Sequence, residues 1–277
     1  MAKKHVKAFT VIELLLVIAI IGLLSSIVLV ATKGIREKAQ VASFFQYDAT
    51  IKHTLGADIV GEWLLDEGSG VTAKDSSGSG NDLTVNPSWA QWESSSAAPE
   101  LKGAIKAINS NLGVYKTTIP ASSPLNLGGG SFTISCWVKT MIYTSGPHRF
   151  FIFSITNGSY YLGKDTSNRA ILYVGGVGTT ADATTLLTEG EWSFVVGTYD
   201  QDQNKAAIYI NGDKVKEQTL TPTIWQKGTT TGTARIGYAA INNSFDQVRV
   251  YSEKLSSAQI YNLYVEGVQT HGLLTEK

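Results

Sequence analysis

The feature that most constrains this chain is an apolar run near its N-terminus. From Val11 to Ala31 there are 21 residues and a single ionisable side chain, Glu13. About 20 consecutive apolar residues are enough for a helix to span the hydrocarbon core of a bilayer. The run therefore predicts a transmembrane helix. A carboxylate near the end of such a helix is costly, which indicates that Glu13 has a partner or a function.

Basic residues flank the apolar run on both sides. They are Lys3, Lys4 and Lys7 before it, and Lys33, Arg36 and Lys38 after it. Basic residues on a short leading segment favour its retention in the cytoplasm and export of the long C-terminal part, although the second cluster weakens this asymmetry. A secretory signal peptide has a shorter apolar region followed by a small-residue cleavage site. Here the small residue, Ala8, precedes the run, which argues against that alternative.

The segment from Lys3 to Glu13 resembles the prepilin leader of type IV pilins and pseudopilins. The resemblance implies that a prepilin peptidase/methylase cuts between Ala8 and Phe9 and methylates the new α-amino group of Phe9. It also implies that Glu13 neutralises this amine on a neighbouring pilin subunit, since methylation keeps the charge. The family usually has Gly before the cut, and Ala8 is small enough to be accepted. An uncleaved membrane anchor is the alternative.

The helix is expected to continue beyond the membrane. Apolar residues recur at helical spacing at Ile35, Ala39, Ala42, Phe45 and Ala49, and no proline occurs before Pro87. At about 1.5 Å per residue, a helix from Val11 to Leu55 is roughly 65 Å long. The expected divisions are a leader (1–8), a transmembrane part (9–31), a continuation of the helix (32–57), a β-sandwich (58–267) and a tail (268–277).

Charge and cysteine content narrow the function classes. The chain has 23 basic and 23 acidic residues, and loss of residues 1–8 removes three lysines, which leaves 20 against 23, or about −3. No basic patch stands out, so nucleic acid is not an expected partner. Cys136 is the single cysteine, which excludes an intramolecular disulfide. The roughly 210 residues after the helix are enough for a core that needs no such bridge.

After Gly61 the helical periodicity gives way to short β-rich runs separated by turn residues. This pattern predicts an antiparallel sandwich or barrel. The candidate strands are Gly61–Leu65, Phe132–Thr140, Phe150–Ile155, Ala170–Val174, Trp192–Tyr199, Ala206–Ile210 and Gln247–Tyr251. Asn211-Gly212 predicts a hairpin turn after the sixth of these, because both turn residues tolerate positive φ.

The C-terminal part predicts one short helix, from about Ser257 to Glu266. Ser256 and Gln259 have the spacing of a capping box, with Leu255 and Ile260 as the hydrophobic staple around it. Gly267 is expected to end the helix. The expected fold class is thus α+β by parts: a long N-terminal transmembrane and assembly helix, then an antiparallel β-sandwich (jelly roll) with a short C-terminal helix.

Six phrases of the exported part, taken in order, resemble laminin-G-like jelly-roll domains of the concanavalin-A-like superfamily. The resemblance covers about residues 61–266, except that residues 89–102 match poorly, so the path of residues 86–103 stays open. The phrases are Gly61–Gly68, Asp75–Asn81, Phe132–Lys139, Trp192–Asp200, Ile208–Gly212 and Phe245–Tyr251.

This resemblance implies a Ca²⁺ site near the meeting point of the N- and C-terminal strands. Calcium takes six to eight oxygen ligands, many of them from carboxylates and carbonyls. Asp75 and Asp246 match the positions of the family, and Asn81 and Asp66 are further candidates in the same segments. The alternatives are that Asp75 only caps its own turn and that Asp66 is a solvated loop residue.

Aromatic residues are the expected sugar contacts. In the run from Phe132 to Lys139, alternation places Phe132, Ile134, Cys136 and Val138 on one face and Trp137 on the other. If the first set is core, Trp137 lies on the outer face of the sheet and is the candidate ligand-binding residue; the alternative is that a covering segment packs on it. Trp192 is expected in the core, and Trp89, Trp92 and Trp225 lie in irregular segments.

Catalytic patterns are not found in the sequence, so no enzymatic activity is expected. The alternating carboxylates of a retaining glycanase strand, Gly-x-Ser-x-Gly and His-Glu-x-x-His do not occur. The four histidines are scattered, and the Gly128–Gly130 run neither follows a clear strand nor opens a helix.

The resulting hypothesis is a pilin-like subunit, inserted as a single-pass membrane precursor and then assembled into a surface filament. Its jelly-roll domain would bind glycans or other cell-surface polymers. Two alternatives stay open. One is a pseudopilin of a secretion or DNA-uptake machine, and the other is an unprocessed membrane-anchored lectin-like protein.

Overall fold

A computed structural model describes residues 11–18, 20–21, 58–93, 103–108, 113–141, 150–155, 160–165, 167–175, 180–220, 232–239 and 242–270. The chain divides into two compact units, residues 1–55 and 56–277. In the first unit, residues 11–18 and 20–21 are helical. Within the described residues, no helix is both long enough and apolar enough to cross a membrane. Most of the long helix expected over 9–31 and 32–57 lies outside the described residues.

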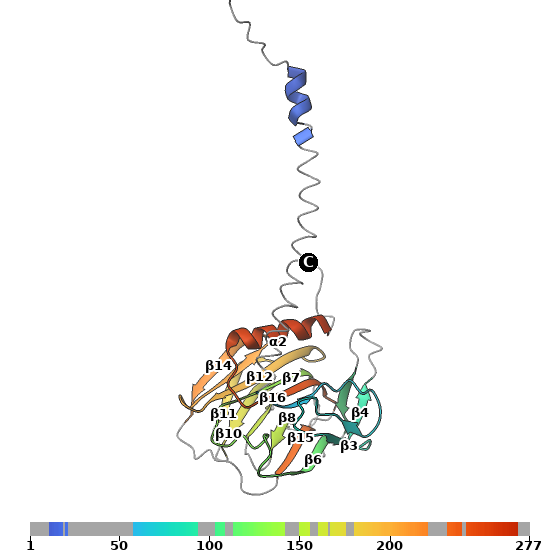
Figure 1. Ribbon diagram of the computed structural model, residues 1–277, viewed down its shortest axis with the longest axis vertical. Helices are drawn as coiled ribbons and strands as arrows, with labels where there is room; N and C mark the ends of the chain where they lie inside the picture. The colour runs from blue at the N-terminus through green and yellow to red at the C-terminus, as the bar shows by residue number, and fades with distance from the viewer. Residues whose placement is uncertain are drawn as a thin grey trace, which may run out of the picture. The chain divides into compact units, whose positions relative to one another are not determined.

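The second unit, which we call the head, is a strand-rich antiparallel sandwich followed by one helix, as expected (Figure 1). The elements are β1 (Ile59–Trp63), β2 (Thr72–Ala73), β3 (Leu83–Val85), β4 (Ala90–Glu93), β5 (Ala104–Ala107), β6 (Val114–Ile119), β7 (Phe132–Lys139), β8 (Phe150–Ile155), β9 (Tyr160–Lys164), β10 (Arg169–Val174), β11 (Thr180–Leu186), β12 (Trp192–Asp200), β13 (Lys205–Ile210), β14 (Asp213–Thr219), β15 (Gly232–Tyr238), β16 (Ser244–Tyr251) and α2 (Ser257–Thr270).

Two eight-stranded sheets form the sandwich. Sheet A has the order β14-β13-β12-β7-β16-β5-β4, and β1 also pairs with β16. Sheet B has the order β11-β10-β9-β8-β15-β6-β3-β2. The path left open over residues 86–103 includes β4, which pairs with β5 at the edge of sheet A.

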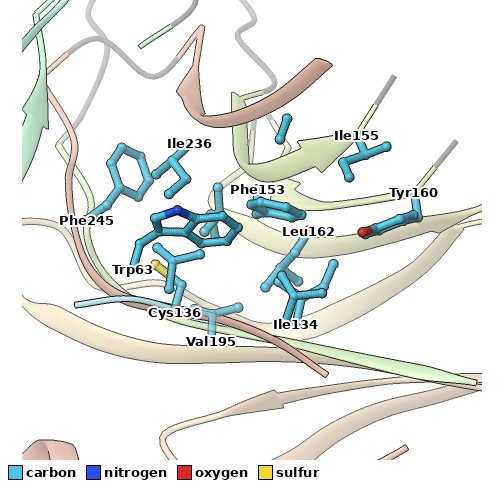
Figure 2. Packing of buried hydrophobic residues seen from close by; sticks show 14 of the residues in the cluster. Trp63, Ile134, Cys136, Phe153, Ile155, Tyr160, Leu162, Val195, Ile236 and Phe245 are labelled. Carbon is cyan, nitrogen blue, oxygen red and sulfur yellow. The ribbon is translucent and has the colours of Figure 1, made fainter. Parts of the chain in front are cut away.

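The core lies between the inner faces of the two sheets. Phe132, Ile134, Cys136 and Val138 of β7 all belong to it, which confirms the alternation expected for this strand. Trp63 of β1 stacks on Phe153 of β8, with ring centroids 5.4 Å apart (Figure 2). Because the head has its own continuous core and is a compact unit by itself, it meets the conditions for folding independently of the N-terminal unit.

The predicted hairpin at Asn211-Gly212 is confirmed. Both residues have positive φ, 52° and 85°, and β13 and β14 pair on either side of them. The turn is also fastened to sheet A. Its Asn211 side chain accepts the backbone N–H of Phe194 at 2.9 Å, and its own N–H donates to the Phe194 carbonyl.

The capping box of α2 is confirmed, but the predicted end of the helix is wrong. Ser256 donates its N–H to the Gln259 side chain at 2.8 Å, and its hydroxyl accepts the Gln259 N–H at 3.3 Å. The helix continues to Thr270, so Gly267 lies inside it rather than after it. The reason for glycine is close packing: a Cβ at this position would lie 2.1 Å from Nε1 of Trp137.

Candidate functional site

Helix α2 covers part of the outer face of sheet A, and this determines whether the side chain of Trp137 is accessible to a ligand. The helix contacts β12 and β14 (Figure 1). Trp137 does lie on the outer face, as expected, but its side chain is 0% exposed. Its ring is 5.3 Å from that of Phe194 and 5.8 Å from that of Tyr264, which belongs to α2. The structure thus has the alternative considered from the sequence, a covering segment packed on Trp137, and this segment is α2, which leaves the ring no surface for a glycan.

A buried guanidinium joins α2 to the first strand of the head. Arg249 of β16 pairs with Glu62 of β1 at 2.8 Å and with Glu266 of α2 at 3.7 Å. Burial alone lowers the pKa of Arg249, but Tyr251 and the two carboxylates outweigh it, so the net pKa is raised. Arg249 is therefore held in its charged form, and the cluster is a structural link between the two ends of the head.

Asp75 organises the loop that follows β2. One of its carboxylate oxygens accepts the N–H groups of Glu62 and Ser77, both at 3.0 Å, and the other accepts that of Asn81 at 2.8 Å. Asp75 thus caps its own turn, which is the alternative considered from the sequence. It also fixes the loop to β1 through Glu62.

The other three calcium candidates have different surroundings. Asn81 is buried, and its amide donates to the Val60 carbonyl at 3.3 Å. Asp246 is buried at a bulge of β16, and its carboxylate accepts the N–H of Gln247 at 2.8 Å. Asp66 is exposed. Within the described ranges, no group of three or more His, Cys, Asp or Glu side chains could hold a metal ion. Because carbonyl oxygens also bind calcium, the calcium site stays a prediction.

A hollow of about 330 Å³ lies beside the glycine-rich segment 128–130. Its walls also include Val60, Asn126, Ser131 and Ser252. No charged side chain is among the residues that line it. The hollow thus offers shape but little chemistry by which a ligand could be recognised.

The outer face of sheet B carries a straight row of polar and aromatic side chains. The strand registers place each of its members directly opposite the next, from β3 across β6, β15, β8 and β9 to β10. Each position lies next to at least one core residue in its own strand, so all of them point away from the core. We call it the outer-face row, and its members are Thr84, Tyr115, Arg235, Ser154, Tyr161 and Tyr173.

The row exposes rings over much of its length. Tyr115, Tyr161 and Tyr173 are half-buried, while Ser154 is buried. The rings of Tyr161 and Tyr173 stack with centroids 4.9 Å apart and planes within 8° of parallel. At the other end, Trp89 packs on Tyr115 with centroids 5.5 Å apart. Five strand spacings of about 4.8 Å make the row roughly 24 Å long.

Arg235 is the charged member of the row. Its guanidinium lies over the ring of Tyr238, 4.9 Å from the ring centroid. Its Nε is buried and has no hydrogen-bond acceptor within the described part of the chain. Half-buried tyrosines and a cation without an acidic partner among the described residues are a combination suited to sugar rings with polar or anionic substituents.

Single members of the outer-face row could be recognised from the sequence, but their alignment into one row could not. Tyr161 and Tyr173 occupy outward positions of strands whose inward residues are apolar, a pattern visible in the sequence. The alignment of these two strands with Arg235 and Tyr115 depends on pairings between distant segments. Of the irregular-segment tryptophans, Trp89 joins the end of the row.

The N-terminal site residues fall mainly outside the structure. Ala8 and Phe9 lie outside the described residues, so the cleavage and methylation sites stay predictions. Glu13 lies in the helical segment 11–18, and its side chain is exposed in this single chain.

Comparison with protein families supports both parts of the chain. The model of the concanavalin A-like lectin/glucanases superfamily matches residues 113–261. This is more than half of the sequence, and the chain belongs to that superfamily. The prokaryotic N-terminal methylation motif matches residues 3–29, which confirms the similarity to type IV pilin precursors. Among curated proteins, none matches the chain.

Solved structures share the fold of the head at low sequence identity. The binding domain of Paraclostridial Mosquitocidal Protein 1 is 16% identical, with a TM-score of 0.59, over 77% of this chain and 53% of that chain. The receptor binding domain of botulinum neurotoxin type G is 17% identical, with a TM-score of 0.56, over 76% of this chain and 51% of that chain. Trypanosoma rangeli sialidase in complex with sialic acid is 14% identical, with a TM-score of 0.56, over 77% of this chain and 34% of that chain. The matched region is about half of each toxin domain and a third of the sialidase, and the likeness is one of fold.

Proposed function

We propose that this protein is a pilin-like subunit of a type IV-type surface filament and that its head binds glycans. The precursor is anchored in the membrane by its apolar segment, cut between Ala8 and Phe9, and methylated at Phe9. Glu13 then neutralises the amine of Phe9 on a neighbouring subunit during assembly. The match of residues 3–29 to the methylation motif and the 21-residue apolar run support this part of the proposal.

The outer-face row is the observation that supports glycan binding. It combines half-exposed tyrosine rings with an arginine that lacks a carboxylate partner among the described residues, on a rigid sheet. A botulinum neurotoxin DC binding domain in complex with SialylT has a similar fold, with a TM-score of 0.51. Because the two sequences are only 15% identical, this similarity supports the statement that the fold can carry a glycan-binding site, but not the position of that site in this chain.

A non-enzymatic role fits both halves of the chain. The methylation motif is typical of structural filament subunits, and the superfamily of the head includes both lectins and glucanases, but the sequence contains none of the catalytic patterns sought above. The sialidase similarity, at 14% identity, does not carry a catalytic site over to this chain.

The pseudopilin alternative rests on the same N-terminal motif, so cellular location separates the two. Mass spectrometry of material sheared from intact cells tests it. A peptide beginning at methylated Phe9 in the sheared fraction is the expected result. Processed protein that stays with the membrane supports a pseudopilin, and protein that retains residues 1–8 contradicts processing altogether.

The role of Glu13 has a direct test with a matched control. Glu13→Leu should reduce the filament yield strongly while leaving the amount of processed subunit in the membrane unchanged. Ile12→Leu, which changes a neighbouring apolar side chain and no charge, should leave the yield as in the wild type. Equal filament yields from the two variants would contradict the proposed pairing of Glu13 with the amine of Phe9.

Glycan binding is tested on the isolated head, residues 56–277, by array binding and calorimetry. Tyr161→Ala should raise the Kd of a bound glycan about tenfold or more, as removal of a central contact ring does in other binding sites. Tyr261→Ala is the control, because this tyrosine is 53% exposed but lies on α2. A head that binds no glycan, or a loss that is the same for both variants, would contradict the proposed site.

A further inference from the structure

Arg235 differs from the other described arginines in having no carboxylate partner. Arg169 pairs with Asp165 at 2.6 Å, and Arg249 pairs with Glu62 at 2.8 Å. No ion pair among the described residues includes Arg235, although it lies on a sheet surface between two neighbouring strands. Arg235 is half-buried, so part of its guanidinium is withdrawn from water without an acidic partner among the described residues.

The hydrogen bonding of Arg235 is also incomplete. Guanidinium has five N–H donors and needs acceptors for those that water cannot reach. The Nε–H group is buried without an acceptor, and such a group carries a desolvation cost. The ring of Tyr238 under the guanidinium offsets part of this cost and holds the side chain in place.

The position of Arg235 within the outer-face row defines what it can contact. Tyr115 is its direct cross-strand neighbour on β6, and Ser154 is its neighbour on β8, followed by Tyr161 on β9. The Arg235 cation thus has a tyrosine on each side along the row: Tyr115 is one strand away and Tyr161 is two strands away. Asp165, which directly follows β9, is already held by Arg169.

We propose that the outer-face row binds an anionic glycan, with Arg235 as the residue that recognises its carboxylate or sulfate group. This inference rests on the proposed glycan-binding function and specifies its ligand class. The anionic substituent lies at Arg235, whose planar fork suits oxyanions. The neutral sugar rings on either side of it pack on Tyr115 and on the Tyr161–Tyr173 stack.

The surface favours a glycan over an acidic peptide. Peptides that bind sheets as added strands use the free N–H and C=O groups of an edge. Along the row, the strands pair on both sides from β6 to β10, so the backbone groups are used within sheet B. What remains for a ligand is a set of rings and one cation along about 24 Å, and a linear glycan of several sugars can follow that length.

The test uses the head, residues 56–277, and an array of matched glycan pairs. Each pair differs only in its anionic group: sialylated against desialylated, uronate against its methyl ester, and sulfated against desulfated. The wild-type head should bind the anionic member of at least one pair about tenfold or more tightly, with the preference falling as salt is added. The comparison of sialylated, uronate and sulfated pairs identifies the anionic group.

Arg235→Gln should abolish the preference while changing the affinity for the neutral member less than twofold. Lys205→Gln, which removes an exposed positive charge from sheet A, should leave the preference intact. Should Arg235→Gln fail to fold, Arg235→Lys keeps the charge without the fork and should weaken only the anionic members. Equal binding of both members by the wild-type head overturns this inference and leaves the proposed function standing. A head that binds no glycan overturns both.

Discussion

Replacement of Gly267 by alanine tests the packing of α2 on sheet A. In an ordinary helix interior, Gly→Ala stabilises a protein by about 1 kcal/mol, because glycine loses more backbone entropy on folding. The same change should destabilise this head. A Cβ at position 267 would lie 2.1, 2.4 and 2.6 Å from the Nε1, Cε2 and Cζ2 atoms of Trp137.

The magnitude follows from how little the neighbours can move. Carbon atoms in contact normally lie about 3.5–4.0 Å apart, so α2 would have to rise by about 1.5 Å to relieve the overlap. Trp137 cannot rotate away, because it is fully buried between Phe194 and Tyr264. Overpacking of a well-packed core costs about 1–3 kcal/mol, and the lifted helix also loses contacts with the sheet. After the helix-propensity gain is subtracted, we expect a net loss of about 1–2 kcal/mol.

The assay is urea and thermal unfolding of the head, residues 56–277. A loss of about 1–2 kcal/mol corresponds to a fall in Tm of roughly 2–8 °C for a domain of this size. Gly130→Ala is the matched control, because the added Cβ would meet only the Leu127 carbonyl at 3.6 Å, an ordinary contact. It should leave the Tm nearly unchanged.

A double-mutant cycle identifies the cause of the effect. In a Trp137→Phe background the smaller ring leaves room for the new methyl group, so Gly267→Ala should cost about 1 kcal/mol less than in the wild type. An increase in Tm on Gly267→Ala, as helix propensity alone predicts, would refute the close packing of these two residues.

The remaining predictions concern polar groups of the head. Asp75→Ala should destabilise the head by about 1–3 kcal/mol, because three backbone N–H groups lose their acceptor. If Asp75 also binds calcium, this ion should raise the Tm of the wild-type head. An equal Tm in saturating calcium and in chelator would contradict the calcium prediction. The hydrogen bond from Lys254 lowers the pKa of Asp200 below its ordinary value of 3.8, so this carboxylate stabilises the folded state above that pH, and the contribution is lost as the pH falls through the lowered pKa. Asp200→Asn should therefore lower stability at pH 7 and converge with the wild type in acid unfolding titrations; a difference that is constant with pH would contradict this. Burial raises the pKa of the Cys136 thiol, so thiol reagents should label it only upon unfolding, as a timed labelling series in urea will show.

Much of the sandwich could be predicted because its signals are local. The alternation of β7 and the turn at Asn211-Gly212 depend on residues adjacent in sequence, and both were predicted correctly. The capping box before α2 is equally local. The end of α2 was missed because glycine has two uses, as a C-terminal stop and as a point of close approach. Only the tertiary packing against Trp137 distinguishes them at Gly267.

The candidate site could not be predicted for a different reason. Sequence alternation identified Trp137 as an outward residue and left open whether a segment covers it, but it could not identify α2 as that segment. The row on sheet B requires Tyr115, Arg235 and Tyr161 to come into register from three separate regions of the chain. No short-range sequence pattern indicates which distant strands pair, because each strand alone shows only that a residue points outward among apolar neighbours.

Under the proposed function, in which a filament carries the head, the fastening of Glu62 has a mechanical consequence. Tension applied through the chain ahead of residue 58 reaches the head at β1. At Glu62 this strand is held in three ways: by its ladder with β16, by the Asp75 carboxylate, and by the Arg249 guanidinium. Arg249 also holds Glu266, so the load on the first strand is shared with the last helix. Removal of β1 from the head must therefore break its ladder with β16, the hydrogen bond to Asp75 and the ion pair with Arg249 at the same point of the strand.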